Sequence, residues 1–296
     1  YDDKNAGGHN YAFPCRKRDQ QMMDYELLDS GDGKKLERFK DVCLIRSSAT
    51  AIWPKSSPSL WGQYSAEFVR MGEQGQWRYR NRNLKEWWIT IDSVSCLLKL
   101  TPFGHVGIFP EHAGFWKDLQ PSVAKPSCRV LNLFAYTGAS SIFCAQQGAT
   151  VYHVDASKAA VKWAQKNVEG NAFQDKRVFW IIEDVFSFLK KEIRRGKTYD
   201  VILLDPPTYG RGPDGETFKI DRDFFPLLEL CSQLLSSSFS HMLITSHTPG
   251  HTPEFLHCLA RRALPMLPLQ GWRLGENFCG EGNQRLPSGV FAQWSL

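Results

Sequence analysis

The chain lacks several features that would place it in a special class of protein. Its longest apolar runs, such as Val201 to Leu204, are far shorter than the roughly 18 residues of a membrane-spanning helix. Its eight cysteines form no CxxC pair and no cluster of four ligands, so neither a disulfide framework nor a metal site is expected. No signal peptide is recognisable, and the start at Tyr1 leaves open what precedes it. These observations favour a reducing, cytoplasmic setting without a membrane partner.

Composition and charge are those of an ordinary folded protein. The chain has 296 residues, 42% hydrophobic and 23% charged, which excludes a disordered chain, a collagen-like fibre and a coiled coil. Lysine and arginine outnumber the acidic residues by 36 to 31, which gives a net charge of +5. This charge permits a nucleic-acid partner but does not by itself argue for one.

The residue pattern changes near position 120, which predicts two domains. Residues 1–119 contain short runs of β-type residues between turn residues, so a smaller β-rich N-terminal region is expected. Residues 120–296 alternate strand and helix patterns, which is typical of βαβ units. Residues 120–127 include two prolines and are expected to form a linker. The expected N-terminal strands are 41–46, 76–80, 87–91 and 95–100.

The C-terminal part predicts an α/β domain around a mainly parallel sheet. Strands are expected at 128–134, 150–154, 177–182, 199–204, 240–245, 266–275 and 288–294. Helices are expected at about 139–147, 158–169, 186–193, 224–235 and 253–263. Ser157 is a good N-cap for the second helix.

Three expected strands end in an acidic residue: Asp155, Asp184 and Asp205. Ligands of open parallel sheets bind beyond the carboxyl ends of the strands, so these acids should line one crevice. The first strand leads instead to Gly138, which permits close approach of a ligand to the backbone. Asp155 is placed to bind ribose hydroxyls, and Asp184 to bind the edge of an adenine ring. Singly, such residues can be a turn glycine and helix N-caps, but together they favour a nucleoside cofactor.

A dinucleotide-binding Rossmann enzyme is the main alternative for these residues. Its Gly-x-Gly-x-x-Gly turn holds a pyrophosphate at a helix N-terminus, whereas residues 134–141 read Phe-Ala-Tyr-Thr-Gly-Ala-Ser-Ser. The single glycine and the bulk of Tyr136 favour a cofactor without a pyrophosphate.

The stretch Asp205-Pro206-Pro207-Thr208-Tyr209 is the most specific signal. Two prolines after a buried strand fix the backbone and leave carbonyl groups unpaired. These carbonyls and the Asp205 carboxylate can accept hydrogen bonds from an amino group. Tyr209 can stack on a planar base, a contact worth about 1–3 kcal/mol. The structural alternative is a rigid turn with a packed tyrosine.

From about Asp29 to the C-terminus, the chain resembles class I S-adenosylmethionine-dependent methyltransferases of the bacterial large-subunit ribosomal RNA group. The resemblance rests on residues 27–39, 107–111, 132–138, 154–157, 183–186 and 205–210. It implies a Rossmann-like, seven-stranded methyltransferase sheet with an antiparallel last strand, S-adenosyl-L-methionine as cofactor, and 23S ribosomal RNA or its precursor as partner. It also implies catalytic roles for Asp205, Pro206, Pro207 and Tyr209, and a cofactor site formed by Phe109, Pro110, Phe134, Tyr136, Thr137, Gly138, Asp155, Ala156, Ser157, Asp184, Val185 and Asp205.

Two departures from the family affect the expected chemistry. Residues 1–28 contain no clear counterpart of the RNA-binding module that many relatives carry. Relatives that methylate cytosine C5 place a nucleophilic cysteine after the fifth strand, where this chain reads Thr245-Ser246-His247-Thr248. Because C5 needs covalent activation by a thiolate, we expect transfer to a nitrogen of guanine or adenine.

Two histidines and a group of three arginines can each be interpreted as functional or as structural. His247, like His105, can face the transfer site or bond a neighbouring backbone group. Arg78, Arg80 and Arg82 would share one face of a strand, with Trp77 and Tyr79 facing the small domain. That row suits an RNA backbone, but it can equally be a charged edge strand that resists aggregation.

Two other functions remain compatible with the sequence. One is a methyltransferase for a small molecule or a protein, and the other is a non-catalytic RNA-binding protein of the same fold. The oligomeric state is left open.

Overall fold

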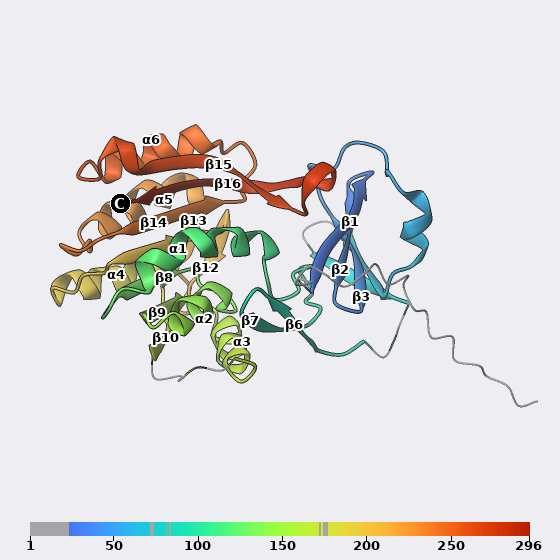
Figure 1. Ribbon diagram of the computed structural model, residues 1–296, viewed down its shortest axis with the longest axis horizontal. Coiled ribbons are helices and arrows are strands. Elements are labelled where there is room, and N and C mark those ends of the chain that lie inside the picture. The colour runs from blue at the N-terminus through green and yellow to red at the C-terminus, as the bar shows by residue number, and fades with distance from the viewer. Residues whose placement is uncertain (1–23, 72–73, 81, 83, 172, 174–176) are drawn as a thin grey trace, which may run out of the picture.

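The computed structural model describes residues 24–71, 74–80, 82, 84–171, 173 and 177–296, and it places two sheets side by side (Figure 1). Most of residues 1–28, where no RNA-binding module is expected, lie outside this description. The N-terminal sheet has the order β1-β2-β3-β4-β5, with β3 and β4 parallel and the other pairs antiparallel. Its strands are Tyr25–Gly31, Lys34–Phe39, Val42–Ser47, Ala66–Met71 and Gln74–Tyr79, with the short helix η1 (Pro58–Gly62) between β3 and β4.

The second sheet has seven strands in the order β10-β9-β8-β11-β14-β16-β15. The pairs from β10 to β14 are parallel, and β16 runs antiparallel to both of its neighbours. This confirms the expected fold class, including the antiparallel last strand. The strands are β8 Arg129–Leu133, β9 Thr150–Asp155, β10 Val178–Ile182, β11 Val201–Leu204, β14 His241–Ser246, β15 Trp272–Cys279 and β16 Leu286–Ser295.

Helices cover both faces of this sheet. Alternate residues of the central strands enter different cores: Val130 and Val201 pack with α1 and α2, whereas Leu131 and Ile202 pack with α4, α5 and α6. Burial on both faces explains why these strands are continuous hydrophobic runs. The helices are α1 Trp116–Val123, α2 Ala139–Gln146, α3 Lys158–Val168, α4 Val185–Arg194, α5 Ile220–Ser232 and α6 Pro253–Ala263. No helix in the described ranges is long and apolar enough to span a bilayer.

Several expectations about element boundaries are wrong. The helix expected at 224–235 is α5, which begins at Ile220 and ends at Ser232. Residues 120–123 belong to α1 and not to a linker, although Pro121 lies inside the helix. Proline in a helix interior costs about 3 kcal/mol, but Leu119 and Val123 are fully buried on this helix, and their packing outweighs that cost. The sixth strand of the large sheet begins at Trp272, because a short 3-10 helix follows Pro268.

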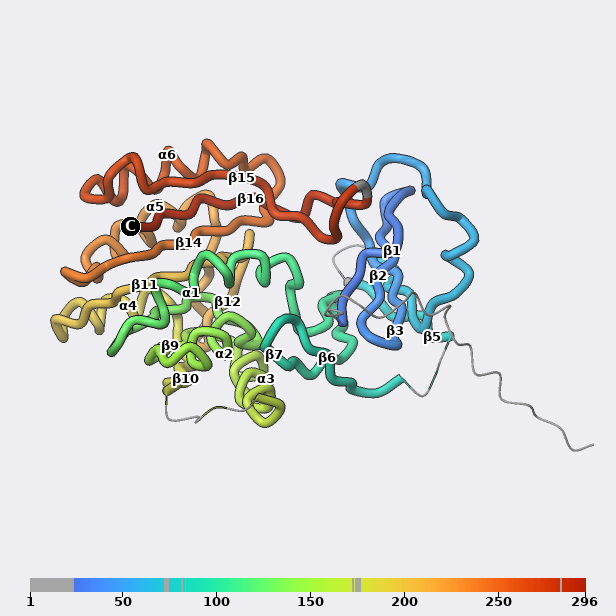
Figure 2. The backbone as a smooth tube through the Cα atoms, viewed as in Figure 1, coloured from blue at the N-terminus to red at the C-terminus, as the bar shows by residue number. Residues whose placement is uncertain are grey.

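Two hairpins connect the parts of the molecule. The hairpin of β6 (Trp87–Ile91) and β7 (Val94–Leu98) lies against α2 and α3. The β15–β16 hairpin extends from the large sheet to the N-terminal sheet, as the tube in Figure 2 shows. A third, short hairpin of β12 (Tyr209–Arg211) and β13 (Thr217–Lys219) follows β11.

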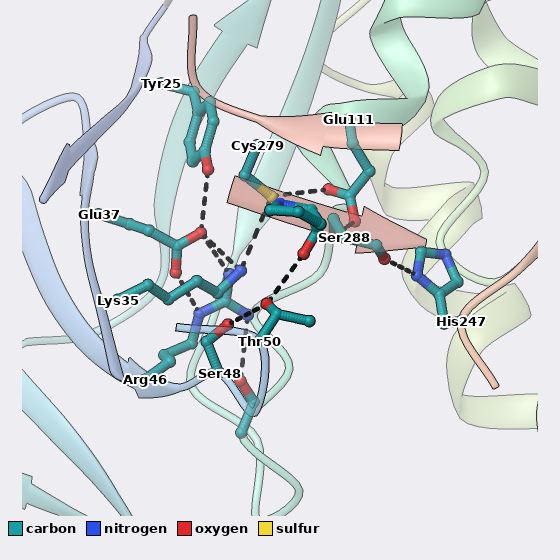
Figure 3. Close-up of polar contacts among 12 residues, drawn as sticks. Tyr25, Lys35, Glu37, Arg46, Ser48, Thr50, Glu111, His247, Cys279 and Ser288 are labelled. Carbon is teal, nitrogen blue, oxygen red and sulfur yellow. Dashed lines mark hydrogen bonds and ion pairs between the residues drawn. The ribbon is translucent and has the colours of Figure 1, made fainter. Parts of the chain in front are cut away.

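A buried ion cluster lies where the β15–β16 hairpin meets the N-terminal sheet (Figure 3). The fully buried Glu37 carboxylate accepts two hydrogen bonds from Arg46, at 2.7 and 2.8 Å, and lies 3.1 Å from the Lys35 ammonium. Burial raises the pKa of Glu37, but the two cations outweigh this effect and hold it below its usual value. Glu37 is therefore ionised inside the fold, and Arg46 and Lys35 balance its charge.

Replacing Arg46 with methionine should lower the free energy of unfolding by about 3 kcal/mol, because Glu37 keeps a single buried cation. Arg38→Met is the matched control, since Arg38 pairs with Glu26, whose side chain is 52% exposed. That pair should contribute at most about 1 kcal/mol. Urea unfolding of both variants checks this, and equal losses would contradict it.

Candidate functional site

The turn after β8 forms the centre of the carboxyl edge of the large sheet. Phe134, Tyr136 and Gly138 have left-handed φ values of 55°, 51° and 83°. Such values at non-glycine residues cost about 1–3 kcal/mol and need support from the surroundings. The turn leads into α2, whose first N–H groups have no side-chain cap and are available to a ligand.

Hydrogen bonds hold this turn against the upstream segment. The Thr137 hydroxyl donates to the Gly107 carbonyl at 2.5 Å, and the Asn167 amide donates to the Thr137 carbonyl at 2.8 Å. Gly107 passes so close to Trp163 that a Cβ there would lie 2.3 Å from the indole ring. The turn is thus fixed by α3 and by the chain that carries Phe109.

Asp155 lies at the end of β9, beside the turn. Its carboxylate accepts hydrogen bonds from the backbone N–H groups of Tyr136 and Ser157, both at 2.8 Å. Burial raises the pKa of Asp155, and these two donors partly counteract it. Ser157 caps α3, as expected, because its side chain accepts a hydrogen bond from the backbone N–H of Ala160. Ala156, between Asp155 and Ser157, is half-buried.

Asp184 caps α4, because its Oδ1 atom accepts from the backbone N–H of Ser187 at 3.0 Å. The N-cap alternative considered for the strand-end acids therefore holds at this position. The neighbouring Val185 is buried as the first residue of α4. Both residues lie at the carboxyl end of β10, next to β9.

Asp205 lies at the end of β11, between two imidazoles. Its Oδ1 atom accepts from the Thr245 hydroxyl at 2.5 Å and lies 3.5 Å from His247 Nε2. Its Oδ2 atom lies 3.7 Å from His112 Nε2. His112 follows the 107–111 motif directly, which is the only sequence signal that could have indicated it.

Aromatic rings join the upstream segment to this edge. The Phe109 ring stacks on His247 with centroids 5.6 Å apart and also lies 5.6 Å from the Tyr136 ring. Pro110 is buried at the start of the short helix η2 (Pro110–Phe115). His105 makes edge contacts with Phe109 and Tyr136. The structure thus brings the upstream residues expected at the site next to the strand ends.

Tyr209 is not a packed aromatic residue, because 49% of it is exposed at the start of β12. Pro206 is buried and Pro207 exposed, so the segment leaves the sheet directly at Asp205. The Arg211 guanidinium contacts the Tyr209 hydroxyl at 3.4 Å. The ring therefore lies open to solvent, close in sequence to the Asp205 carboxylate.

His247 bonds a neighbouring backbone group, which is one of the two interpretations expected for it. Its Nδ1 atom contacts the Ser288 carbonyl on β16, and its Nε2 atom faces Asp205. Burial lowers the pKa of His247, but the Asp205 and Glu111 carboxylates outweigh it and raise the pKa above 6.5. The approach of β16 needs Gly289, where a Cβ would lie 2.9 Å from Nδ1.

The arginine row does not exist as expected. Strand β5 ends at Tyr79, so Arg78 is its last arginine. Arg80 bends back over the Tyr64 ring, 4.7 Å from its centroid, because it also donates to the Gly62 carbonyl. Tyr79 is half-exposed and does not face the small domain. β5 is an edge strand, which fits the alternative of charges that resist aggregation.

Gly107→Ala should destabilise the protein by at least about 2 kcal/mol more than Gly148→Ala. Both glycines have similar left-handed φ values, 106° and 102°, but a Cβ at Gly148 would meet nothing within 4 Å. The difference in unfolding free energy therefore measures the contact with Trp163. Equal losses in urea unfolding would remove this close approach as a constraint on the turn.

Known proteins resemble this chain in both fold and sequence. Residues 70–275 match the sequence profile of the S-adenosylmethionine-dependent methyltransferases. The crystal structure of the SAM-dependent methyltransferase from Agrobacterium tumefaciens is 34% identical, with a TM-score of 0.86 over 92% of this chain and 90% of that one.

Curated relatives are longer proteins. Ribosomal RNA large subunit methyltransferase K/L of Ectopseudomonas mendocina is 30% identical over 235 residues, which cover 76% of this chain and 28% of that protein. The protein of the same name from Magnetococcus marinus is 34% identical over 47% of this chain and 19% of its own length. The chain spans less than half the length of the first ribosomal RNA methyltransferases that it matches. The profile match and the full-length structural similarity place the chain in the S-adenosylmethionine-dependent methyltransferase family, enzymes that use S-adenosyl-L-methionine (SAM) as cofactor.

Proposed function

We propose that the protein transfers the methyl group of SAM to a base nitrogen of RNA, with large-subunit ribosomal RNA or its precursor as substrate. The names of its relatives supply the substrate class. The observation that supports a base as acceptor is the exposed Tyr209 ring, four residues after Asp205. An open aromatic face four residues after a strand-end carboxylate suits a base that is stacked and hydrogen-bonded at once.

The residues at the strand ends fit the cofactor. The uncapped start of α2 and the left-handed turn leave backbone N–H groups beside Asp155. We assign ribose binding to Asp155, because its carboxylate is fixed by two backbone donors at the edge of the crevice. Asp184 and Val185 would border the adenine, and Phe109 and Pro110 would close the site from upstream.

Positioning is the main task of the remaining residues. SAM supplies a methyl group that is already electrophilic, so the protein must align a nucleophile with it. Asp205, held by the Thr245 hydroxyl, and the carbonyl groups at Pro206 and Pro207 would accept hydrogen bonds from an amino group on the base. Tyr209 would fix the plane of the ring by stacking.

The cysteines support a nitrogen acceptor over cytosine C5. Of the seven cysteines in the described part of the chain, six are buried and only Cys258, on α6, is exposed. Burial raises the pKa of Cys279 to about 11 and that of Cys231 to about 12. Such thiols are protonated near neutral pH and do not act as nucleophiles. A nitrogen lone pair needs no thiolate.

We assign the catalytic part to residues 120–296, to which the upstream segment contributes Phe109, Pro110 and the start of α1, and the RNA-contacting part to residues 1–119. Within the second, Arg78 is exposed on β5, and Arg82 lines an open surface hollow with Tyr79 and Leu84. Exposed arginines beside an aromatic ring suit a phosphate backbone with an unstacked base.

Asp155→Ala should weaken binding of SAM and S-adenosylhomocysteine at least about tenfold, because it removes a charge-assisted acceptor worth about 1.5–3 kcal/mol. Calorimetry of the folded variant measures this, with NAD as a ligand that should not bind. Asp118→Ala is the control, since Asp118 is exposed on α1 and pairs with Arg273. An affinity equal to that of the native protein would remove Asp155 from the site.

Incubation with methyl-labelled SAM and large-subunit ribosomal RNA should label a purine nitrogen, identified by nucleoside analysis. Tyr209→Ala should reduce this transfer about tenfold or more without changing SAM affinity, because the lost stacking is worth about 1–3 kcal/mol. Phe179→Ala is the control, since Phe179 is 49% exposed on the edge strand β10. Labelled 5-methylcytosine would contradict the nitrogen target. SAM binding without any RNA labelling would contradict RNA as the substrate.

A further inference from the structure

Three potential ligands from distant parts of the chain converge at the carboxyl edge of the large sheet. His112 comes from η2, Asp205 from the end of β11 and His247 from the end of β14. One ligand atom from each lies within 4.8 Å of the others. From this arrangement we infer that the three residues bind a divalent transition-metal ion. The inference goes beyond methyl transfer, and it shares Asp205 with the proposed function, in which this carboxylate also accepts hydrogen bonds from the base.

The hydrogen bond that His247 makes through Nδ1 leaves its Nε2 atom, an acceptor, facing the Asp205 carboxylate, which is also an acceptor. The Ser288 carbonyl can only accept a hydrogen bond, so the Nδ1 atom that contacts it carries the proton. In the neutral imidazole, the Nε2 lone pair then faces the Asp205 carboxylate, which is unfavourable unless a proton or a metal ion lies between them. A ring N–H bonded to a backbone carbonyl is also the usual support of a metal-bound histidine.

His112 shows the same need for a cation. Its Nε2 atom is buried and has no hydrogen-bond partner among the described residues. It lies 3.7 Å from Asp205 Oδ2. Two imidazole nitrogens therefore approach one carboxylate without bonding to it.

The distances favour a metal ion over a shared proton. An N–H···O hydrogen bond spans about 2.7–3.2 Å, so separations of 3.5 and 3.7 Å are too long for one. Donor atoms bound to one ion at about 2.0–2.2 Å lie about 3.3–3.6 Å apart at tetrahedral angles. The separation of each imidazole from its own Asp205 oxygen is close to this range, and one ligand atom of each residue lies within 4.8 Å of the others.

The surroundings add negative charge and space. The buried Glu111 carboxylate accepts from the Ser288 hydroxyl at 2.6 Å, on the residue whose carbonyl holds His247 (Figure 3). The Lys35 ammonium also acts on His247, but it is engaged by Glu37 and the Cys279 sulfur. A cavity of about 30 Å³ reaches His112 and Asp205 but not His247, and apolar residues such as Phe115 and Leu203 form much of its lining. It has room for about one water molecule beside these two ligands.

The donor set points to Zn²⁺ or a similar ion. Imidazole nitrogens suit zinc, cobalt, nickel and ferrous iron, whereas Mg²⁺ and Ca²⁺ prefer oxygen donors. Three protein ligands leave an open position, as in sites where a metal ion holds a substrate atom. The sequence predicted no metal site because the three ligands lie on separate segments and none is a cysteine.

The test is a titration of the full chain with Zn²⁺ by calorimetry and with Co²⁺ by visible absorption. One equivalent should bind to the native protein, and the affinity should fall more than tenfold in both His112→Ala and His247→Ala, since even outer residues of metal sites contribute 10–100-fold. His112→Asn and His247→Asn replace these variants if thermal unfolding shows that alanine prevents folding.

His257→Ala is the matched control. Its imidazole lies 3.4 Å from the Glu254 carboxylate on α6, away from the three ligands, so its loss should leave affinity unchanged. No binding by the native protein, or equal binding by all variants, would overturn the inference and leave a protonated imidazole beside Asp205. SAM affinity, measured separately, tests the proposed function, so the two ideas can fail independently.

Discussion

The hydrogen bond from the Thr137 hydroxyl to the Gly107 carbonyl is the constraint on which the site depends. It ties the turn after β8, with its left-handed residues, to a segment that precedes the large sheet in sequence. Through it, Phe109 and His112 reach the edge where Asp155 and Asp205 end their strands.

The N-terminal sheet is connected to the same edge by a chain of polar contacts. Glu37 binds Lys35, Lys35 reaches the Cys279 sulfur, and Cys279 contacts the Glu111 carboxylate. Ser288 then joins Glu111 to His247. Because buried charges need fixed partners, these contacts set the position of the β15–β16 hairpin relative to the N-terminal sheet. The sheet therefore forms part of the support of the residues at the strand ends.

Several features of the fold were predictable because they depend on local patterns. Continuous hydrophobic runs indicated the central strands, and the residue after each run identified the acids at their ends. The helix at α1 was missed because two prolines suggested a linker, whereas the burial of Leu119 and Val123 decided its structure. The prediction of a row of arginines was wrong because of another tertiary contact: the regular strand ends at Tyr79, and Arg80 packs on the Tyr64 ring.

The sequence by itself determined the separate strands, the strand-end acids and the Asp205-Pro206-Pro207 segment, because strand periodicity and proline geometry act over a few residues. That the strands form one seven-stranded sheet was implied by the resemblance to the methyltransferases. Only the tertiary structure decided which distant residues meet. His112, His247 and Ser288 come together because η2, β14 and β16 converge at one edge. Contacts between such distant segments produce no recognisable residue spacing in the sequence. The two imidazoles around Asp205 and the Ser288 carbonyl that holds His247 could therefore not be predicted.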